Sequence, residues 1–313
     1  MSGASVLFDA PGPRARSISL IASLVGGALI AGILGWVVWM LAQPRESGGV
    51  KVAPILDGSR WDIFSDPVVW ESIGRGVVGT LQAAAVAAAF ALVLGVVFSL
   101  LRSSEIAWIR IPTAWVLEFL RGMPVLLMML FILLVASTGS FWAVVIALAL
   151  YNGTLIGEAL RAGLAALPRG QREAALSVGM RTMQAKLLVE FPQAFRQMLP
   201  IIVAQLVVLL KDTSLGYIVA YDELVRVMMN RLASYFGNKY LFSLFFVCLV
   251  IYLAINLTLS WFARWLARRT ASGGRRGSRA RAADDTADPT RAIALAQANA
   301  EARRSENTRG GLV

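Results

Sequence analysis

Charged side chains inside long apolar stretches are the residues of this chain most able to do chemistry. Glu118 and Arg121 are three positions apart, as are Glu158 and Arg161, so each pair shares one face of a helix. A charge within a bilayer costs a few kcal/mol unless it is paired or hydrated. Two interpretations therefore stay open: each pair neutralises itself for packing, or the pairs line a polar pathway or hold a gate.

A further charged group, Lys211 and Asp212, consists of sequence neighbours, which a regular helix points in different directions. Either the helix ends there with Asp212 capping the next turn, or each charge has a partner on another helix. Thr213 and Ser214 add two hydroxyl groups beside this pair. With the polar Asn152, the candidate pathway residues are Glu118, Arg121, Asn152, Glu158, Arg161, Lys211, Asp212, Thr213 and Ser214.

The segment from Pro168 to Pro192 is polar and basic, has a helix-forming composition, and lies between two apolar stretches. Residues 169–178 and 181–190 are each able to form a short helix. Gly179 is the expected break between them, because glycine permits a sharp turn or a close backbone contact. A structured loop of this length between two spans predicts a contact with something outside the membrane.

Ala174, Ala175 and Ser177 give the first of these short helices a face that another protein can approach closely. Glu173 lies in its first turn, where the helix dipole favours a negative charge by about 0.3–1 kcal/mol. An ordinary surface helix pair and a docking element are both compatible with this pattern. We favour the docking element.

The apolar stretches that surround these residues indicate an all-α integral membrane protein. Charged residues make up 16% of the chain, against about 25% in soluble domains, and the mean hydropathy is +0.65. A bilayer crossing needs about 20 apolar residues, and open sheet edges cannot face lipid. About six transmembrane helices are expected, over residues 18–42, 75–101, 112–136, 141–163, 196–219 and 240–266.

The boundary between the third and fourth expected spans comes from length. Residues 122–157 carry no charge and would extend roughly 54 Å as one helix, which is too long for one crossing. The residues Ser137-Thr138-Gly139-Ser140 predict a tight turn that divides the stretch. Pro124 is expected to bend the third span.

Charge outside the spans predicts the topology. The chain carries a formal net charge of +11, and many of its arginines lie in the C-terminal tail from Arg264. The positive-inside rule then places the tail, the 164–196 loop and the 102–111 loop in the cytoplasm, with both termini inside. Juxtamembrane arginine is the ordinary topological signal, so no nucleic-acid partner is expected. The first apolar stretch is longer than the core of a cleaved signal, so a retained anchor is expected.

The residue types that are missing limit the chemistry. The sequence has no histidine and one cysteine, Cys248, which argues against a metal site and excludes an intrachain disulfide. It has no Gly-x-x-x-x-Gly-Lys-Ser/Thr motif, so ATP hydrolysis by this chain is not expected. We therefore predict no catalytic residues, no metal and no cofactor.

The 168–192 segment resembles the EAA loop of ABC importer permeases, through Glu173-Ala174-Ala175, Gly179 and Val189-x-Phe191-Pro192. The family has Ile and Leu where this chain has Val189 and Phe191, and both replacements are apolar. Further segments resemble the polar amino-acid group of the histidine, glutamine and glutamate type. These segments are Arg121-Gly122-Met123-Pro124, Glu158 with Arg161 and Gly163, Pro168 with Gly170 and Gln171, Phe191-Pro192-Gln193-Ala194, Leu199-Pro200, Lys211-Asp212-Thr213-Ser214-Leu215 and Glu223-Leu224.

This resemblance covers about residues 70–267 and is greatest to actinobacterial glutamate-uptake permeases. Two positions depart from the family pattern, Met123 in place of Thr and Ala162 in place of Gly. The resemblance implies a five-helix importer core over residues 70–267. Residues 1–69 then hold an N-terminal cytoplasmic segment, an extra transmembrane helix and an external loop. Residues 268–313 are expected to form a basic, disordered cytoplasmic tail, partly helical at 288–304.

The resemblance also implies a function and partners. The chain would be the permease subunit of an ATP-driven, binding-protein-dependent importer of a polar amino acid in a bacterial plasma membrane. The implied partners are an ABC ATPase dimer, an identical or homologous second permease, an extracytoplasmic amino-acid-binding protein and the lipid bilayer. The residues implied in ATPase coupling are Gln171, Glu173, Ala174, Ala175, Gly179 and Pro192.

Two roles follow for the charged candidates if the cargo is an α-amino acid. Arg121 and Lys211 suit its carboxylate, and Glu118, Asp212 or Asn152 suits its ammonium group. A secondary transporter driven by an ion gradient is the main alternative function, because it needs no docked ATPase. A non-transporting assembly protein of the membrane is a further alternative.

Overall fold

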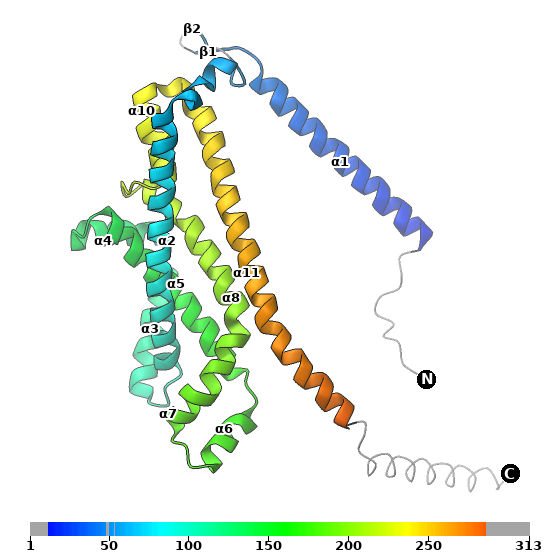
Figure 1. The fold of residues 1–313 in the computed structure, drawn as a ribbon, viewed down its shortest axis with the longest axis vertical. Helices are drawn as coiled ribbons and strands as arrows, with labels where there is room; N and C mark the ends of the chain where they lie inside the picture. The colour runs from blue at the N-terminus through cyan, green and yellow to red at the C-terminus, as the bar shows by residue number, and fades with distance from the viewer. Residues whose placement is uncertain (1–11, 48–49, 53, 286–313) are drawn as a thin grey trace, which may run out of the picture. The chain divides into compact units, whose positions relative to one another are not determined.

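The computed structural model describes residues 12–47, 50–52 and 54–285, and it is helical apart from one short hairpin (Figure 1). The chain divides into two units. Unit 1 comprises residues 1–76 and 224–250, and unit 2 comprises residues 77–223 and 251–313. Two long helices, α2 (Pro67–Arg102) and α11 (Leu241–Asp285), contribute residues to both units.

Unit 1 begins with the long helix α1 (Pro13–Leu41). A two-stranded antiparallel hairpin follows, in which β1 (Arg45–Ser47) pairs with β2 (Val50–Val52). Two 3-10 turns follow the hairpin, Gly58–Arg60 and Asp62–Ser65.

The C-terminal part of unit 1 is a series of short helices. They are α9 (Leu224–Arg226), the π-turn η5 (Val227–Leu232), α10 (Ala233–Phe236) and the 3-10 turn η6 (Asn238–Tyr240). Arg60 joins this series to the first part of the unit, because its Nη1 donates a 2.9 Å hydrogen bond to the carbonyl of Lys239. This bond gives the buried arginine a backbone acceptor.

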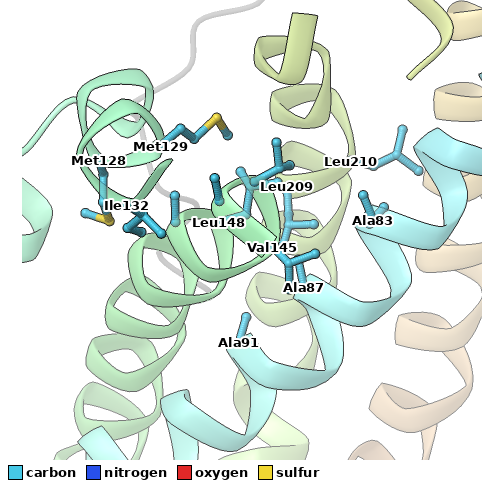
Figure 2. Close-up of a cluster of buried hydrophobic side chains, with 14 of the residues drawn as sticks. Ala83, Ala87, Ala91, Met128, Met129, Ile132, Val145, Leu148, Leu209 and Leu210 are labelled. Atoms are coloured by element: carbon cyan, nitrogen blue, oxygen red, sulfur yellow. The ribbon is translucent and has the colours of Figure 1, made fainter. Parts of the chain in front are cut away.

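Unit 2 holds the remaining helices. They are α3 (Ala107–Gly122), α4 (Val125–Ala136), α5 (Ser140–Ala165), α6 (Arg169–Ser177), α7 (Thr182–Gln184), the π-turn η3 (Ala185–Glu190), α8 (Phe191–Asp212) and the 3-10 turn η4 (Thr213–Tyr217). Side chains from α2, α4, α5 and α8 meet in its apolar core, with Leu148 and Leu209 fully buried (Figure 2). Helix α5 is the central element of this core.

The expected number of membrane spans agrees with the structure. Five helices are long and apolar enough to cross a bilayer, and there are six if one bent pair counts as a span. Within the most apolar window of α5, 67% of the residues are buried, whereas none is buried in that of α1. The side chains in this window of α1 are therefore left without close packing in the described chain.

The bend expected at Pro124 in the third span, 112–136, is confirmed. The bend is so large that the span consists of two helices, α3 and α4, which meet at 102° across Met123 and Pro124. Proline has no N–H to donate and disfavours the helical conformation of the residue before it. Met123 accordingly has an extended backbone, with ψ of 130°. Arg121 thus lies in the last turn of a helix instead of within a continuous span.

The turn expected at residues 137–140 is confirmed. Ser137 has a φ of 49° and Gly139 a φ of 79°, and α5 begins at Ser140. Glycine adopts positive φ without steric cost, which explains its use at this corner. The 122–157 stretch is thereby divided as its length required.

The tail differs from expectation over its first part. Helix α11 continues to Asp285, past residue 268 where disorder was expected to begin. Alanine and arginine, which are frequent in this stretch, are both good helix formers. The helix expected at 288–304 lies outside the described residues.

Helices α2 and α5 approach each other closely through glycine. A Cβ added to Gly95 of α2 would lie 2.6 Å from Ile156 Cγ2 and 3.3 Å from the backbone nitrogen of Gly157. A Cβ added to Gly157 would lie 2.9 Å from Phe98 Cβ and 3.1 Å from the Gly95 carbonyl oxygen. Membrane helices gain little from apolar burial against lipid, so this close packing is a main source of their association.

Gly95→Ala is therefore expected to destabilise the purified protein by about 1–3 kcal/mol, because the added methyl group overpacks the crossing. Gly74→Ala on the same helix is the matched control, since a Cβ there meets nothing within 4 Å. Both changes raise helix propensity by the same amount. The difference between the stabilities of the two variants therefore reports the steric clash of the methyl group added at Gly95 alone. Thermal unfolding in detergent measures it, and equal Tm values for the two variants would contradict the packing account.

Candidate functional site

The loop after α5 is built around Gly179, as the sequence predicted. Helix α6 ends with hydrogen bonds from the N–H of Gly179 to the Leu176 carbonyl, 3.0 Å, and from the N–H of Met180 to the Ala175 carbonyl, 3.2 Å. Gly179 has a φ of 84°. This is the Schellman arrangement, in which a glycine in left-handed conformation satisfies the last carbonyls of a helix.

The second short helix of this loop is not separate. Residues 182–217 form one helical run that includes α7, η3 and α8, so the expected boundary at Pro192 is wrong. Pro192 lies in the first turn of α8, directly after the π-turn η3. The wider turn accommodates a residue that lacks an N–H without ending the helix.

Five of the six predicted coupling residues are at least partly exposed: Gln171, Glu173, Ala174, Gly179 and Pro192. Ala175 is only 6% exposed and packs inside the chain, so it positions α6 and does not present a surface. Val178 and Met183, on either side of Gly179, are 76% and 60% exposed. These two apolar side chains extend the exposed surface, and their place in a polar loop was the signal that could have identified them.

Polar contacts hold the loop to the connection between α2 and α3. Arg172 of α6 forms an ion pair with Glu105. Lys186 Nζ donates a 2.6 Å hydrogen bond to the carbonyl of Ser103. A displacement of α6 must therefore be shared by residues 103–105, or these contacts must break. In Figure 1, α6 and α7 lie at the end of unit 2 where α5 ends and α8 begins.

A bond within the loop links its two limbs. Gln193 Nε2 donates to Gln171 Oε1 at 2.9 Å and to the carbonyl of Val189 at 2.8 Å. Gln171 is exposed, and this hydrogen bond also joins it to the start of α8. The limbs before and after Gly179 are therefore connected at their bases.

The two predicted ion pairs on α3 and α5 are both present. Arg121 pairs with Glu118 at 2.5 Å, and Arg161 Nη2 pairs with Glu158 at 2.6 Å. Arg102 of α2 and Arg121 of α3 each have a through-space electrostatic effect on Glu158 of α5. We call Glu118, Arg121, Glu158 and Arg161 the charge cluster. Helix α3, which carries the first pair, contacts α5, which carries the second.

The Lys211 and Asp212 group lies at the end of α8, where the helix tightens into η4. Neither sequence alternative is fully met, because the helical run continues from α8 into η4 and Asp212 makes no side-chain cap to that turn. Thr213 donates a 2.7 Å hydrogen bond to the Leu210 carbonyl, and Ser214 donates one of 2.8 Å to the Lys211 carbonyl. Both hydroxyl groups are thus used locally at this junction.

Asn152 is fully buried and joins two helices. Its Nδ2 donates to the Leu148 carbonyl at 2.8 Å, and its Oδ1 accepts a 2.8 Å hydrogen bond from Gln205 Nε2 on α8. Gln205 was not among the predicted residues, because nothing in one sequence pairs it with Asn152. The bond is an interhelical link at the centre of the unit 2 core.

A second buried polar group was not predicted from the sequence either. Glu223 is fully buried, and Tyr252 of α11 donates a 3.1 Å hydrogen bond to its Oε2. Tyr221 donates a 2.8 Å hydrogen bond from its hydroxyl to the Gly79 carbonyl of α2. These contacts join positions up to 142 residues apart in sequence, which no local spacing reveals.

Metal ligands are not gathered at any of these places. Over residues 12–47, 50–52 and 54–285, no group of three or more His, Cys, Asp or Glu side chains is positioned to hold a metal ion. The single cysteine, Cys248, is buried.

The chain was compared with known proteins. A family model described as the binding-protein-dependent transport system inner membrane component matches residues 91–272. The glutamate transport system permease protein GluD of Corynebacterium glutamicum is 38% identical over 205 residues, which cover 63% of this chain and 74% of that protein. The arginine transport system permease protein ArtQ of Bacillus subtilis is 31% identical over 162 residues, 49% of this chain and 72% of that protein.

The fold agrees with these sequence matches. The crystal structure of an amino acid ABC transporter with histidines superimposes with a TM-score of 0.60 at 26% identity, covering 68% of this chain and 99% of that chain. The residues matched by the family model include the charge cluster and the loop around Gly179. The chain therefore belongs to the binding-protein-dependent inner membrane permeases of ABC importers, which makes it a multi-pass transport subunit of an inner membrane.

Proposed function

We propose that this chain carries a polar amino acid, with a glutamate-like solute favoured, through an ATP-driven importer that takes its cargo from a binding protein. The relatives named for glutamate and arginine transport support the class of cargo. The observation that carries the mechanism is the exposed surface around Gly179 on a loop bonded to the α2–α3 connection. Family membership supports this function over a secondary transporter driven by an ion gradient.

The proposed partners follow from this surface. An ATPase in the cytoplasm docks on α6 and the turn at Gly179, and a dimer of that ATPase serves this chain and a second permease, identical or homologous. An extracytoplasmic binding protein delivers the amino acid to the opposite side. Both termini then lie in the cytoplasm, on the same side as the 168–192 loop.

Coupling would pass through the contacts described above. Closure of the ATPases displaces α6, and the Arg172–Glu105 pair and the Lys186 bond carry this displacement to residues 103–105. Those residues directly precede α3, whose far end bears Arg121 and the 102° bend into α4. Work is transmitted only if the ATPase binds the two permease conformations with different affinity.

For the cargo, we propose that Arg121 and Lys211 attract its carboxylate and that Glu118 or Asp212 attracts its ammonium group. The four side chains of the charge cluster are already paired in this structure. A zwitterionic cargo would therefore have to replace one partner of an existing ion pair, because it meets no isolated charge in the cluster. Asn152 is a weaker candidate, because both of its polar atoms are engaged between α5 and α8.

The first prediction concerns the driving force. Proteoliposomes that contain this chain with the ATPase, the second permease and the binding protein should accumulate labelled glutamate only when ATP is hydrolysed. An uncoupler at constant ATP should leave uptake unchanged, since no ion gradient does the work. Unlabelled glutamine and arginine, added as competitors in the same assay, rank the candidate cargoes by how strongly each inhibits glutamate uptake. Uptake that persists with a non-hydrolysable ATP analogue would exclude the proposal.

The second prediction concerns Gly179. Gly179→Trp should reduce co-purification of the ATPase by tenfold or more, roughly the loss of one interface hot spot, while the permease stays folded. A Cβ at this position meets nothing within 4 Å in the chain, so the added bulk projects outward.

Two controls separate bulk from strain. Gly179→Asn adds a small side chain that tolerates positive φ and should retain most of the ATPase. Gly58→Trp places the same indole at a glycine that also has open space around it, but outside the loop, and should bind the ATPase normally. Equal losses for Gly58→Trp and Gly179→Trp would show that the loop is not the contact.

The third prediction concerns the cargo pathway. Arg121→Gln, Lys211→Gln and Asp212→Asn should each lower uptake by about 10- to 100-fold, because each removes a charge-assisted hydrogen bond. Arg110→Gln on α3 is the matched control, since Arg110 is exposed and lies outside the charge cluster. Unchanged uptake in the three variants at equal expression would assign these charges to structure alone.

A further inference from the structure

A cleft of about 700 Å³ lies between α6 and the ends of the helices behind it. Its walls come from the ends of α2 and α5, from α6 and from the π-turn η3. Five cationic side chains line it: Arg102, Arg161, Arg169, Arg172 and Lys186. Two carboxylates, Glu173 and Glu190, also line it, so cations exceed anions in a small volume.

Three of the five cations already have partners. Arg161 pairs with Glu158, Arg172 pairs with Glu105, and Lys186 donates to the Ser103 carbonyl. Among the residues with described side chains, no hydrogen bond or ion pair reaches the side chain of Arg102 or Arg169, and Arg102 has only a through-space electrostatic effect on Glu158. The N–H donors of both guanidinium groups are therefore available to an anion from outside the chain.

Two further features of the cleft favour an anion. Arg169 is the first residue of α6, where the positive end of the helix dipole makes a cation unfavourable unless negative charge is bound nearby. Ser103 also lines the cleft, and its hydroxyl group is buried with no partner in the described chain. An oxygen-rich anion would satisfy the two arginines, and it would give this hydroxyl a partner once the Ser103 side chain turned toward the cleft.

The position of the cleft narrows the class of anion that it could bind. Arg102 is the last residue of α2, and Arg161 lies four residues before the end of α5, so both are at the ends of apolar spans. Leu164, Leu167 and Leu176 give the same cleft apolar walls. Basic pockets between helices at this level of the membrane bind lipid phosphates.

We propose that the cleft behind α6 binds a phosphate group, held by Arg102 and Arg169. The phosphate belongs to an acidic phospholipid headgroup or is free in solution, since both present the same oxygens. Arginine recognises such a group with paired, fork-shaped hydrogen bonds. A bound phosphate joins the end of α2 to the start of α6 and restrains the loop that carries Gly179. The cleft shares Arg161 with the charge cluster and Glu173 with the predicted coupling residues, but Arg102 and Arg169 belong to neither set.

The test uses the purified full chain in a neutral detergent and follows its Tm during titration, because a ligand that binds only the folded state raises stability with its concentration. One arm adds phosphatidylglycerol, and a parallel arm adds neutral phosphatidylcholine. A third arm adds inorganic phosphate, with sodium chloride at matched ionic strength as its control. The cleft variant is Arg102→Gln with Arg169→Gln.

Stabilisation by phosphatidylglycerol is expected for the natural chain, with apparent affinity about 30-fold weaker in the cleft variant. That change corresponds to about 1 kcal/mol for each arginine. The matched control is Arg110→Gln with Arg196→Gln, which removes the same charge from exposed positions outside the cleft and should respond like the natural chain. The single variant Arg169→Gln, at an exposed position, should show part of the loss.

The arms also identify the source of the phosphate. An effect of phosphatidylglycerol that is lost in the cleft variant supports the site with a lipid ligand. An effect of inorganic phosphate that is lost in the same variant supports the site with a free ligand. Equal responses of the cleft and control variants, or no response to either phosphate source, would overturn the proposal.

Discussion

Close packing around α5 is the constraint on which the rest of unit 2 depends. Lipid tails are as apolar as leucine, so helices in a bilayer associate through contact and hydrogen bonding and not through burial from water. Gly153 and Gly157 let α2 approach the backbone of α5, and Asn152 bonds to Gln205 of α8 on another side. The bent pair α3 and α4 also contacts α5. A single central helix thus fixes the position of the charged residues and of the loop after it.

The loop illustrates why such a rigid centre matters for transport. Helix α6 begins four residues after α5 ends, so it cannot move far without moving that end. The ion pair of Arg172 with Glu105 connects α6 to the segment before α3, and Lys186 of η3 bonds to the same segment. Helix α3 is also the element that bends into α4. The proposed motion therefore has a path from α6 to α3 through polar contacts outside the apolar core.

Much of this was predictable from local sequence. Hydropathy gave the number of spans, the i to i+3 spacing gave both ion pairs, and Gly179 was identified as the break in the loop. The unpredicted features depend on contacts between distant residues. The 102° bend at Pro124 leads into α4, whose Met128 and Met129 are buried in the core, and the continuous helix through Pro192 includes a π-turn. The partners Asn152–Gln205 and Glu223–Tyr252 are brought together only by the fold.

The charge cluster joins the two interpretations that the sequence left open. Each pair neutralises itself on its own helix, as a purely structural role requires. Helix α3 contacts α5, so rotation of α3 would move one pair relative to the other. Self-neutralised pairs are therefore compatible with a gate, because each arginine keeps its partner on its own helix while the two helices move.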